Sequence, residues 1–259
     1  MRTNMVIGII QARTGSTRLP AKVLRPLAGK PMLLQELLRV KAAKRLDAIT
    51  VATTDKPEDA VIETLATEAG VGCFRGSEAD VLDRFYKAAV AAGAKAGDVV
   101  VRITGDCPLQ VPQVIDSVIA HFVEAGVEYT STPANYPEGL DTEAFTFEAL
   151  ETAWKEAKLP SEREHVTPYI KKVFHSDVWE EGSEDNRTMH WSVDTEADFQ
   201  FVEQVYEALY HEGEVFHLND ILAYVHEHPE LLEINKSGTG YEGLEKSLKE
   251  DERFLTNDL

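Results

Sequence analysis

The alternation of short apolar segments with longer amphipathic ones constrains the fold of this chain more than any other feature of its sequence. Four apolar, β-rich runs have the length of strands buried on both faces: 5–10, 48–53, 71–75 and 98–104. Four segments with apolar residues at helical spacing follow them in turn: 32–43, 60–69, 81–92 and 111–125. Strands that alternate with helices in this way predict βαβ units and a mostly parallel sheet, and therefore an α/β fold.

The pattern changes in the second half of the chain. Residues 129–147 are rich in Tyr, Pro and Thr, which indicates an insertion or hairpin that faces a substrate. A further strand is expected at 188–193, and the tail from 231 onward is polar and helical in part. Helices are expected at 147–158, 161–173, 197–212 and 218–228. We therefore expect a single domain over 1–259 with an insertion at about 128–175.

The predicted sheet also predicts where a ligand binds. In a parallel sheet, ligands bind at the carboxyl ends of the strands. The loops after Ile10, Thr53, Arg75 and Thr104 should therefore lie along one edge of the sheet. These loops hold the unusual residues of the chain, so the sequence predicts a functional site at that edge.

The charge distribution indicates what kind of ligand to expect. The formal net charge of −19 argues against general nucleic-acid binding, which requires an extended basic surface. Before Glu36, however, the chain has basic residues and no acidic one. A local cationic segment in an acidic protein favours a specific small polyanion.

The cysteine content and the length of the apolar runs indicate in which cellular compartment the protein is expected. Cys73 and Cys107 are too few for a disulfide framework and lack metal-site spacing, so a reducing, cytoplasmic environment is expected. We find neither a secretory signal nor an apolar run long enough to span a membrane. The expected partners are therefore small molecules, with no nucleic acid and no membrane.

The loop after the first strand has the composition of an anion site. Gly15 permits a positive φ, and a loop that leaves a strand exposes backbone N–H groups. With Arg13 and Lys22 beside it, the loop can cradle a triphosphate. It is neither a Walker A motif nor G-x-G-x-x-G, and a solvated basic loop is the alternative interpretation. The nucleotide contacts predicted in it are Gln11, Ala12, Arg13, Gly15, Ser16, Arg18 and Lys22.

Two acidic residues follow predicted strands at the same edge. Asp106 follows the strand at 98–104 and Asp194 follows the strand at 188–193. Carboxylates there can hold Mg²⁺ against phosphates, because Mg²⁺ prefers one or two protein oxygens together with waters and substrate. Each could instead be a helix N-cap. Asp198 is expected in the following helix, in a structural role.

A third loop segment also faces the ligand edge. Arg75 and Ser77 follow a short strand and are expected near the nucleotide. Asp80 lies in the same segment, where an i,i+4 ion pair with Arg84 on a solvated helix face is an equally good interpretation.

Seven motifs resemble one family of enzymes. IIQARTGSTRLPAKVL at 9–24 and GKPML at 29–33 are similar to the opening motif of the nucleotidyltransferases that activate acidic sugars with CTP. The resemblance is strongest to the spore-coat polysaccharide protein F-like branch of the acylneuraminate and 3-deoxy-manno-octulosonate cytidylyltransferases. It continues in order through RGSEADVLDRF, RITGDCPL, YPEGLDTEAF, EREHVTPYI and WSVDTEADF, and spans most of residues 6–205.

The resemblance implies a fold and a set of site residues. The fold would be three-layered and Rossmann-like, of the nucleotide-diphospho-sugar transferase type, with a small insertion for acceptor binding and dimerisation. Asp106 and Asp194 would hold the metal. Further nucleotide contacts would be Arg75, Ser77, Asp80, Thr104 and Gly105. The acceptor side would comprise Tyr136, Gly139, Asp141, Glu143, Arg163 and His165.

The acceptor side also has simpler interpretations. Its first segment could be only a turn, and Ser161 with Glu164 could form a capping box. His165 as a general base has weak support. The resemblance further implies a homodimer, with residues of about 130–170 as its contact.

The expected activity is Mg²⁺-dependent transfer of CMP from CTP to an acidic or phosphorylated sugar-like acceptor, with release of pyrophosphate. The residues expected to carry it are Arg13, Lys22, Asp106 and Asp194. Two alternatives are a nucleotide-sugar-dependent glycosyltransferase and a non-catalytic nucleotide-binding protein. The first usually employs an Asp-x-Asp motif after a strand, which this sequence lacks.

Overall fold

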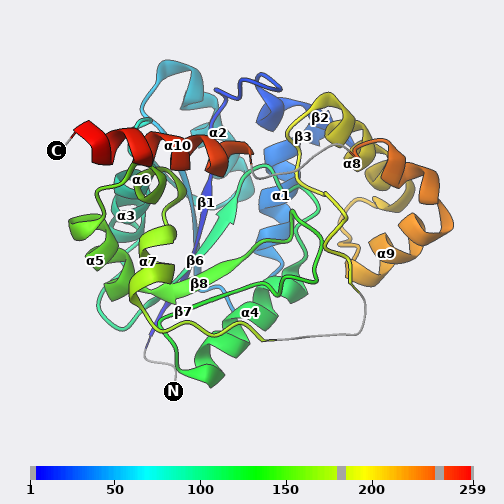
Figure 1. The fold of residues 1–259 in the computed structure, drawn as a ribbon. Coiled ribbons are helices and arrows are strands. Elements are labelled where there is room, and N and C mark those ends of the chain that lie inside the picture. The colour runs from blue at the N-terminus through cyan, green and yellow to red at the C-terminus, as the bar shows by residue number, and fades with distance from the viewer. Residues whose placement is uncertain (1–3, 180–184, 237–241, 258–259) are drawn as a thin grey trace.

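Six strands form one sheet in the computed structural model, which describes residues 4–179, 185–236 and 242–257 (Figure 1). Their order is β5-β4-β1-β6-β8-β7; the first four are parallel, and β8 runs antiparallel to β6 and β7. The strands are β1 (Val6–Gln11), β4 (Ala48–Thr54), β5 (Gly72–Gly76), β6 (Val99–Thr104), β7 (Tyr129–Ser131) and β8 (Glu143–Thr146). A separate ribbon pairs β2 (Pro26–Leu27) with β3 (Lys30–Pro31). The prediction of a mostly parallel sheet is confirmed.

Helices cover both faces of the sheet, because β1 and its neighbours are apolar on both sides. Val6 and Ile10 pack against α1 (Met32–Lys41), α2 (Ala60–Ala69) and α4 (Pro112–Ala125). Ile7 and Ile9 pack against α3 (Val81–Ala91), α5 (Phe147–Glu156) and α7 (Pro168–Val173). The result is the expected three-layer α/β/α arrangement (Figure 1).

The register of the parallel strands aligns the loops that follow them. Gln11 at the end of β1 pairs with Ala52 of β4 and with Thr104 of β6. The loops after β1 and β6 then pass so closely that a Cβ on Gly105 would lie 2.7 Å from the Cβ of Ala12, which only glycine avoids. The prediction that these loops share one edge is confirmed.

The segment at 128–175 joins the sheet. Its strands β7 and β8 extend the parallel part in the antiparallel sense. The single helix predicted at 161–173 is wrong: the chain forms α6 (Pro160–His165) and α7, separated by Val166 at φ 69°. A left-handed residue followed closely by Pro168, which has no N–H to donate, ends one helix and starts another.

The strand predicted at 188–193 is also wrong. Residues 187–188 lie in a turn, and in the described part of the chain the segment forms one isolated bridge, between Glu138 and His190, with Trp191 N–H donating to Glu138 O at 2.8 Å. Trp191 and Val193 are buried, as the apolar pattern requires, yet the neighbour is a loop and not a strand.

The C-terminal helices complete the fold. Helices α8 (Glu196–Leu209) and α9 (Leu218–Glu227), with η3 (Pro229–Glu233), form a third apolar cluster that includes Leu27 and Met32. Helix α10 (Glu242–Asn257) confirms the helical part of the tail and packs on α6; residues 237–241 and 258–259 of the tail lie outside the described part. No helix in the described part is long and apolar enough to cross a membrane.

Candidate nucleotide and metal site

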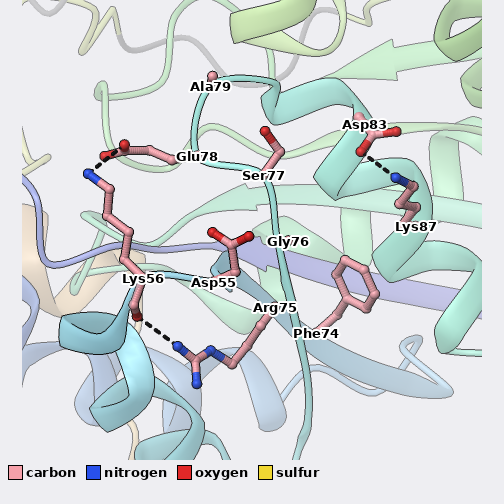
Figure 2. Close-up of a pocket in the computed structure, with 10 residues that line it drawn as sticks. All are labelled: Asp55, Lys56, Phe74, Arg75, Gly76, Ser77, Glu78, Ala79, Asp83 and Lys87. Carbon is pink, nitrogen blue, oxygen red and sulfur yellow. Dashed lines mark hydrogen bonds and ion pairs between the residues drawn. The ribbon is translucent and has the colours of Figure 1, made fainter.

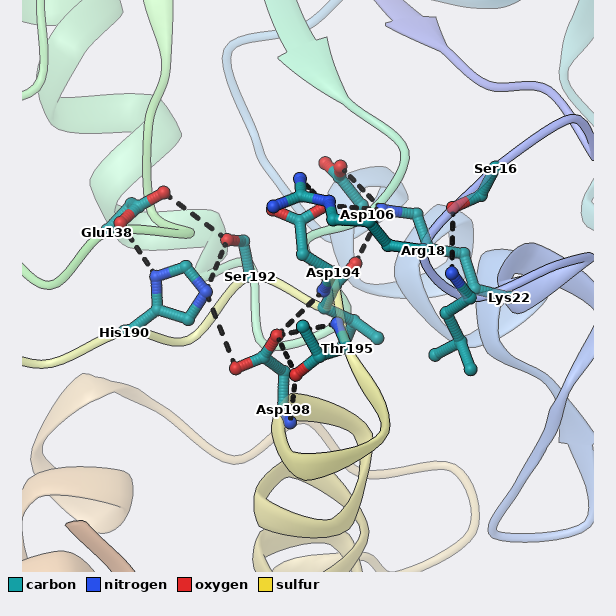
Figure 3. Close-up of polar contacts among 12 residues, drawn as sticks. Ser16, Arg18, Lys22, Asp106, Glu138, His190, Ser192, Asp194, Thr195 and Asp198 are labelled. Atoms are coloured by element: carbon teal, nitrogen blue, oxygen red, sulfur yellow. Dashed lines mark hydrogen bonds and ion pairs between the residues drawn. The ribbon is translucent and has the colours of Figure 1, made fainter. Parts of the chain in front are cut away.

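Lys22 joins three segments that are far apart in the sequence. It begins η1 (Lys22–Leu24), directly after Ala21 in the left-handed region, and its side chain is 9% exposed. Its Nζ donates to Asp106 Oδ2 at 3.0 Å, to Asp194 Oδ1 at 2.9 Å and to Val193 O at 2.5 Å (Figure 3). The structure therefore brings together three of the four residues predicted to be catalytic.

The charges of this cluster stabilise one another. Burial lowers the pKa of Lys22, but Asp106 and Asp194 outweigh it and raise the pKa above its usual value. Burial raises the pKa of Asp106, and Lys22 more than offsets this, so the pKa of Asp106 is lowered. The ammonium and the Asp106 carboxylate are thus both charged at neutral pH.

Neither carboxylate caps a helix. The N-cap of α4 is Val111 and that of α8 is Thr195, so the N-cap interpretations of Asp106 and Asp194 are wrong. Asp198 instead forms the capping box with Thr195, which agrees with the structural role expected for it.

The two carboxylates fit a magnesium ion. Both lie within hydrogen-bond distance of one nitrogen, so Asp106 and Asp194 face a common point. Within the described residues, no group of three or more His, Cys, Asp or Glu side chains is arranged to hold a metal ion. A metal held by only two protein carboxylates completes its coordination from water and phosphate, which is the usual pattern for Mg²⁺ at nucleotide sites.

The phosphate loop is held in place by a residue that the sequence did not single out. Asp59, in η2 (Pro57–Asp59), is 1% exposed and accepts from the backbone N–H and the hydroxyl of Thr14, both at 2.7 Å, and from Thr54 Oγ1. Burial raises the pKa of Asp59, but these hydrogen bonds more than offset it and lower the pKa. The buried carboxylate of Asp59 thus holds the phosphate loop in place at Thr14.

The loop conformation differs from the prediction at Gly15. The residues with positive φ near it are Ala21 and Ala28, and Gly15 is not among them. A Cβ on Gly15 would meet only Glu78, at 3.7 Å. The backbone N–H groups of Gly15 and Thr17 donate to no residue in the described part of the chain, so they remain available to an anion.

The arginines of the loop pair with acids from other segments. Arg18 lies 2.8 Å from Asp194 Oδ1. Arg13 pairs with Glu78 at 3.1 Å, and Lys56 holds the other oxygen of Glu78 at 2.5 Å. The cations of these pairs are between 39% and 46% exposed, whereas Asp194 is only 15% exposed. Because the cations reach solvent, a more highly charged phosphate can replace their carboxylate partners.

Arg75 and Ser77 line a neighbouring cavity. Its volume is about 610 Å³, and it lies at the end of β5, between the residues that follow β4 and the start of α3 (Figure 2). Arg75 donates to the backbone oxygens of Thr54 and Lys56, and Ser77 Oγ accepts from Asp80 N–H. No residue of 11–22 lines this cavity, so it flanks the phosphate loop rather than forming it.

Asp80 and Arg163 pair with each other. Asp80 caps α3, and its two carboxylate oxygens accept from Arg163 at 3.1 and 2.5 Å. The alternative pair with Arg84 does not form, because Arg84 donates to the backbone oxygen of Ser77. The structure thus places Asp80, predicted to contact the nucleotide, against Arg163, predicted to contact the acceptor.

His165 lies beside the C-terminal helix. Its Nε2 is 3.1 Å from Ser247 Oγ of α10. The capping box predicted from Ser161 and Glu164 is wrong: Ser161 donates to Asp251, and Glu162 accepts from the N–H groups that precede α6.

Glu143 is the centre of a buried ion cluster. Arg102 Nη1 donates to its Oε2 at 2.6 Å, and its other oxygen accepts from Tyr129, Thr167 and Lys171. Although burial raises the pKa of Glu143, Arg102 and Lys171 bring it down to about 2. Arg102 also donates to Gln11 at 3.2 Å, so the cluster connects the phosphate loop to the segment at 128–175.

The segment at 136–141 packs on the residues that precede Asp194. Gly139 has φ +98°, and a Cβ there would lie 2.5 Å from the backbone nitrogen of Ser192. Its N–H donates to Asp141 Oδ2 at 3.0 Å, while Tyr136 packs against the third apolar cluster. The predicted acceptor residues therefore fall into two groups, with Arg163 and His165 on α6 and the others on or beside this loop.

Two further residues of the site were not predicted. Glu36 is fully buried in α1, where its Oε2 accepts from Cys107 N–H at 3.2 Å; burial, and then Asp106, raise the pKa of Glu36 well above its usual value. Its place on the apolar stripe of a helix, between Leu33 and Val40, was a detectable signal. His190 carried no such signal, because its partners lie in other segments.

Comparison with known sequences agrees with the geometry. The cytidylyltransferase family matches this chain over residues 7–233. Spore coat polysaccharide biosynthesis protein SpsF of Bacillus subtilis is 34% identical over 213 residues, which are 79% of this chain and 87% of that protein. An uncharacterized protein of Methanocaldococcus jannaschii is 53% identical over 165 residues, 64% of this chain and 66% of that protein. A 3-deoxy-manno-octulosonate cytidylyltransferase of Desulfatibacillum aliphaticivorans is 32% identical over 67% of this chain, which spans 62% of that protein's length.

Solved structures support the same assignment. A cytidylyltransferase from Leptospira borgpetersenii has a TM-score of 0.82 at 29% identity, over 91% of this chain and 98% of that one. A CMP:2-keto-3-deoxy-manno-octonic acid synthetase, solved in complex with CTP, shares the fold with a TM-score of 0.59 at 17% identity, over 79% of this chain and 99% of that one. These likenesses confirm the three-layer fold of nucleotide-sugar transferases. The chain belongs to the cytidylyltransferase family, a family of nucleotidyltransferases.

Proposed function

We propose that the protein transfers CMP from CTP to an acidic or phosphorylated sugar-like acceptor and releases pyrophosphate. The observation that carries this proposal is the convergence of Lys22, Asp106 and Asp194 beside a loop in which the N–H groups of Gly15 and Thr17 have no partner among the described residues. Cations and a pair of carboxylates in one place match a metal-bound triphosphate. The relatives named for cytidylyl transfer to a sugar acid support the choice of nucleotide and of acceptor class.

The phosphate loop would bind the triphosphate. Arg13 and Arg18 would exchange their carboxylate partners for phosphate oxygens, and the N–H groups of Gly15 and Thr17 would donate to others. Lys22 would neutralise charge that develops on the leaving pyrophosphate. No covalent intermediate with the enzyme is required, because alignment and charge neutralisation supply most of the rate enhancement in such transfers.

Asp106 and Asp194 would hold Mg²⁺. The ion, when bound, neutralises phosphate charge and orients the reacting groups. An oxygen of the acceptor attacks the α-phosphorus of CTP, the bond from that phosphorus to the oxygen bridging it to the β-phosphorus breaks, and pyrophosphate leaves with the electron pair. The residues proposed to bind the acceptor are Tyr136, Gly139, Asp141, Glu143, Arg163 and His165.

We further propose the expected homodimer, with residues of about 130–170 as its contact, and a cytoplasmic location. The family resemblance supports the first, and the two free cysteines, Cys73 and Cys107, are compatible with the second. Sedimentation velocity of the purified chain tests the dimer: a monomer at micromolar concentration would contradict it.

The test of the activity is a nucleotide-by-acceptor screen that measures pyrophosphate release. CTP with a sugar acid or sugar phosphate should give turnover, and Asp106→Asn should abolish it while a native circular dichroism spectrum at the assay temperature shows that the variant is folded. Release of a nucleoside diphosphate from a nucleotide sugar would instead identify a glycosyltransferase. Tight CTP binding without turnover on any acceptor would identify a nucleotide-binding protein.

A further inference from the structure

His190 is a buried imidazole between two carboxylates from different segments. It is 7% exposed; its Nδ1 lies 2.7 Å from Glu138 Oε2, and its Nε2 lies 3.5 Å from Asp198 Oδ1 (Figure 3). Its backbone oxygen accepts from Asn235 at 2.6 Å, which fixes the main chain as well. Both ring nitrogens thus face an acid.

Such surroundings favour a doubly protonated ring. A neutral imidazole carries one proton and would present a lone pair to one of the two carboxylates. Burial lowers the pKa of His190, but Asp198 and Glu138 outweigh burial and raise it to about 10. The pKa of Asp198 is lowered in turn to about 2, against the effect of its own burial. The cluster therefore holds one cation between two anions at neutral pH.

The two carboxylates determine the position of the two halves of the site. Asp198 Oδ2 accepts from the backbone N–H of Asp194 at 3.0 Å and from that of Thr195 at 2.7 Å, so it holds the main chain that carries the metal carboxylate. Glu138 precedes Gly139, whose backbone packs against Ser192. The positively charged ring of His190 lies between the two carboxylates and so connects the loop at 136–141 to the main chain at Asp194.

We propose that His190 is a positioning residue whose positive charge ties the loop at 136–141 to Asp194 and so sets the distance between the acceptor side and the metal side of the site. This inference rests on the proposed function for its consequence in turnover. The mechanical connection itself does not depend on which nucleotide or acceptor is bound.

A serine next to this histidine suggests a competing interpretation. Ser192 Oγ lies 3.4 Å from His190 Nε2, and with Glu138 the group has the composition of a nucleophilic triad. A general base must have a free lone pair, whereas Nε2 lies 3.5 Å from the Asp198 carboxylate, which favours a protonated nitrogen at that position. The group is therefore a charged connection and not a nucleophilic site.

Hydrogen exchange of the free protein tests the connection directly. In His190→Gln, amides at 136–141 and at 189–195 should both exchange about tenfold faster than in the wild type, because both segments lose the same restraint. In His190→Arg, which keeps a cation able to reach two carboxylates, both should stay within about twofold. Unchanged exchange in His190→Gln, or acceleration confined to one segment, would overturn the inference. If His190→Gln fails to fold, Glu138→Gln provides the same comparison with one ion pair intact.

Turnover tests the consequence. With an acceptor from the pyrophosphate screen, His190→Gln should lower kcat at least about tenfold with an unchanged Kd for CTP in the absence of metal, and His190→Arg should restore most of kcat. Ser192→Ala should keep wild-type kcat; its loss would support the triad and overturn the charged connection. If the wild type releases no pyrophosphate, the proposed function fails, while the exchange experiment still decides the role of His190.

Discussion

The ammonium of Lys22 lies 3.0 Å from Oδ2 of Asp106 and joins the first loop of the chain to the loop that follows β6. Because the lysine is buried, this ion pair is sensitive to the loss of either partner. The same nitrogen also neutralises Asp194, so the cluster holds its carboxylates together before any ligand binds.

Lys22→Met should therefore destabilise the protein by up to about 3 kcal/mol, since two neighbouring carboxylates lose their common counter-ion. Mg²⁺ should raise the melting temperature of this variant more than that of the wild type, because the metal replaces the missing charge. Thermal unfolding with and without MgCl₂ measures both effects. An equal response of the two proteins to Mg²⁺ would show that Asp106 and Asp194 do not bind the ion together.

Asp59→Ala should weaken CTP binding about tenfold, because it removes the hydrogen bonds that hold Thr14 and thereby loosens the phosphate loop. Titration calorimetry with CTP measures the change. Glu58→Ala, one residue earlier and exposed, is the matched control and should bind CTP like the wild type. An equal loss of CTP affinity in Asp59→Ala and Glu58→Ala would indicate a general effect on η2, and not the loss of the hydrogen bonds to Thr14.

Arg163→Met and Asp80→Asn should show a coupling of about 1 kcal/mol in a double-mutant cycle of unfolding free energies, because the two side chains form a partly exposed fork. Denaturant titrations of the four proteins measure it. If Arg163 binds the acceptor instead, Arg163→Met should raise the KM for the acceptor and Asp80→Asn should not.

Glu143→Gln should cost about 3 kcal/mol of stability, because Arg102, only 14% exposed, would lose the charge of its carboxylate partner. The pKa of Glu143 is about 2 in the folded protein against a usual value of 4.5, so the folded state favours the charged form. This contribution is fully present above pH 4.5 and is lost as the pH falls towards 2. The stability difference between wild type and variant should shrink over that range in denaturant titrations. A constant difference would contradict a stabilising charge on Glu143 in the folded protein.

The charged state of His190 predicts the opposite dependence. Its pKa is about 10 in the folded protein against a usual value of 6.5, so its contribution is fully present below pH 6.5 and is lost as the pH rises towards 10. The stability gap between wild type and His190→Gln should close over this range. NMR titration of the imidazole measures the pKa independently; a value near 6.5 would refute the ion cluster.

Much of the site followed from local patterns. Apolar runs and helical spacing predicted the order of the elements, and the carboxyl ends of parallel strands meet at one edge whatever the remaining details. Lys22 and Asp106 could therefore be expected together from the loops that follow β1 and β6, and the structure places them within hydrogen-bond distance. Asp194 was expected there because it would follow a strand at 188–193. The described residues 185–193 form no such strand, and Val193 N–H reaches the same edge by donating to Asp106 O at 2.8 Å. The same reasoning failed where a single backbone feature intervened, as at Val166, which divides the predicted helix.

By itself, then, the sequence determined the order and type of most elements and the edge at which the functional groups gather, because hydrophobic periodicity and loop chemistry act between near neighbours. Only the tertiary structure decided which charges pair. Arg163 meets Asp80 and His190 meets Glu138 across many residues of chain. A chain with many acids offers each cation many partners, and the packing of the helices and loops against the sheet selects among them.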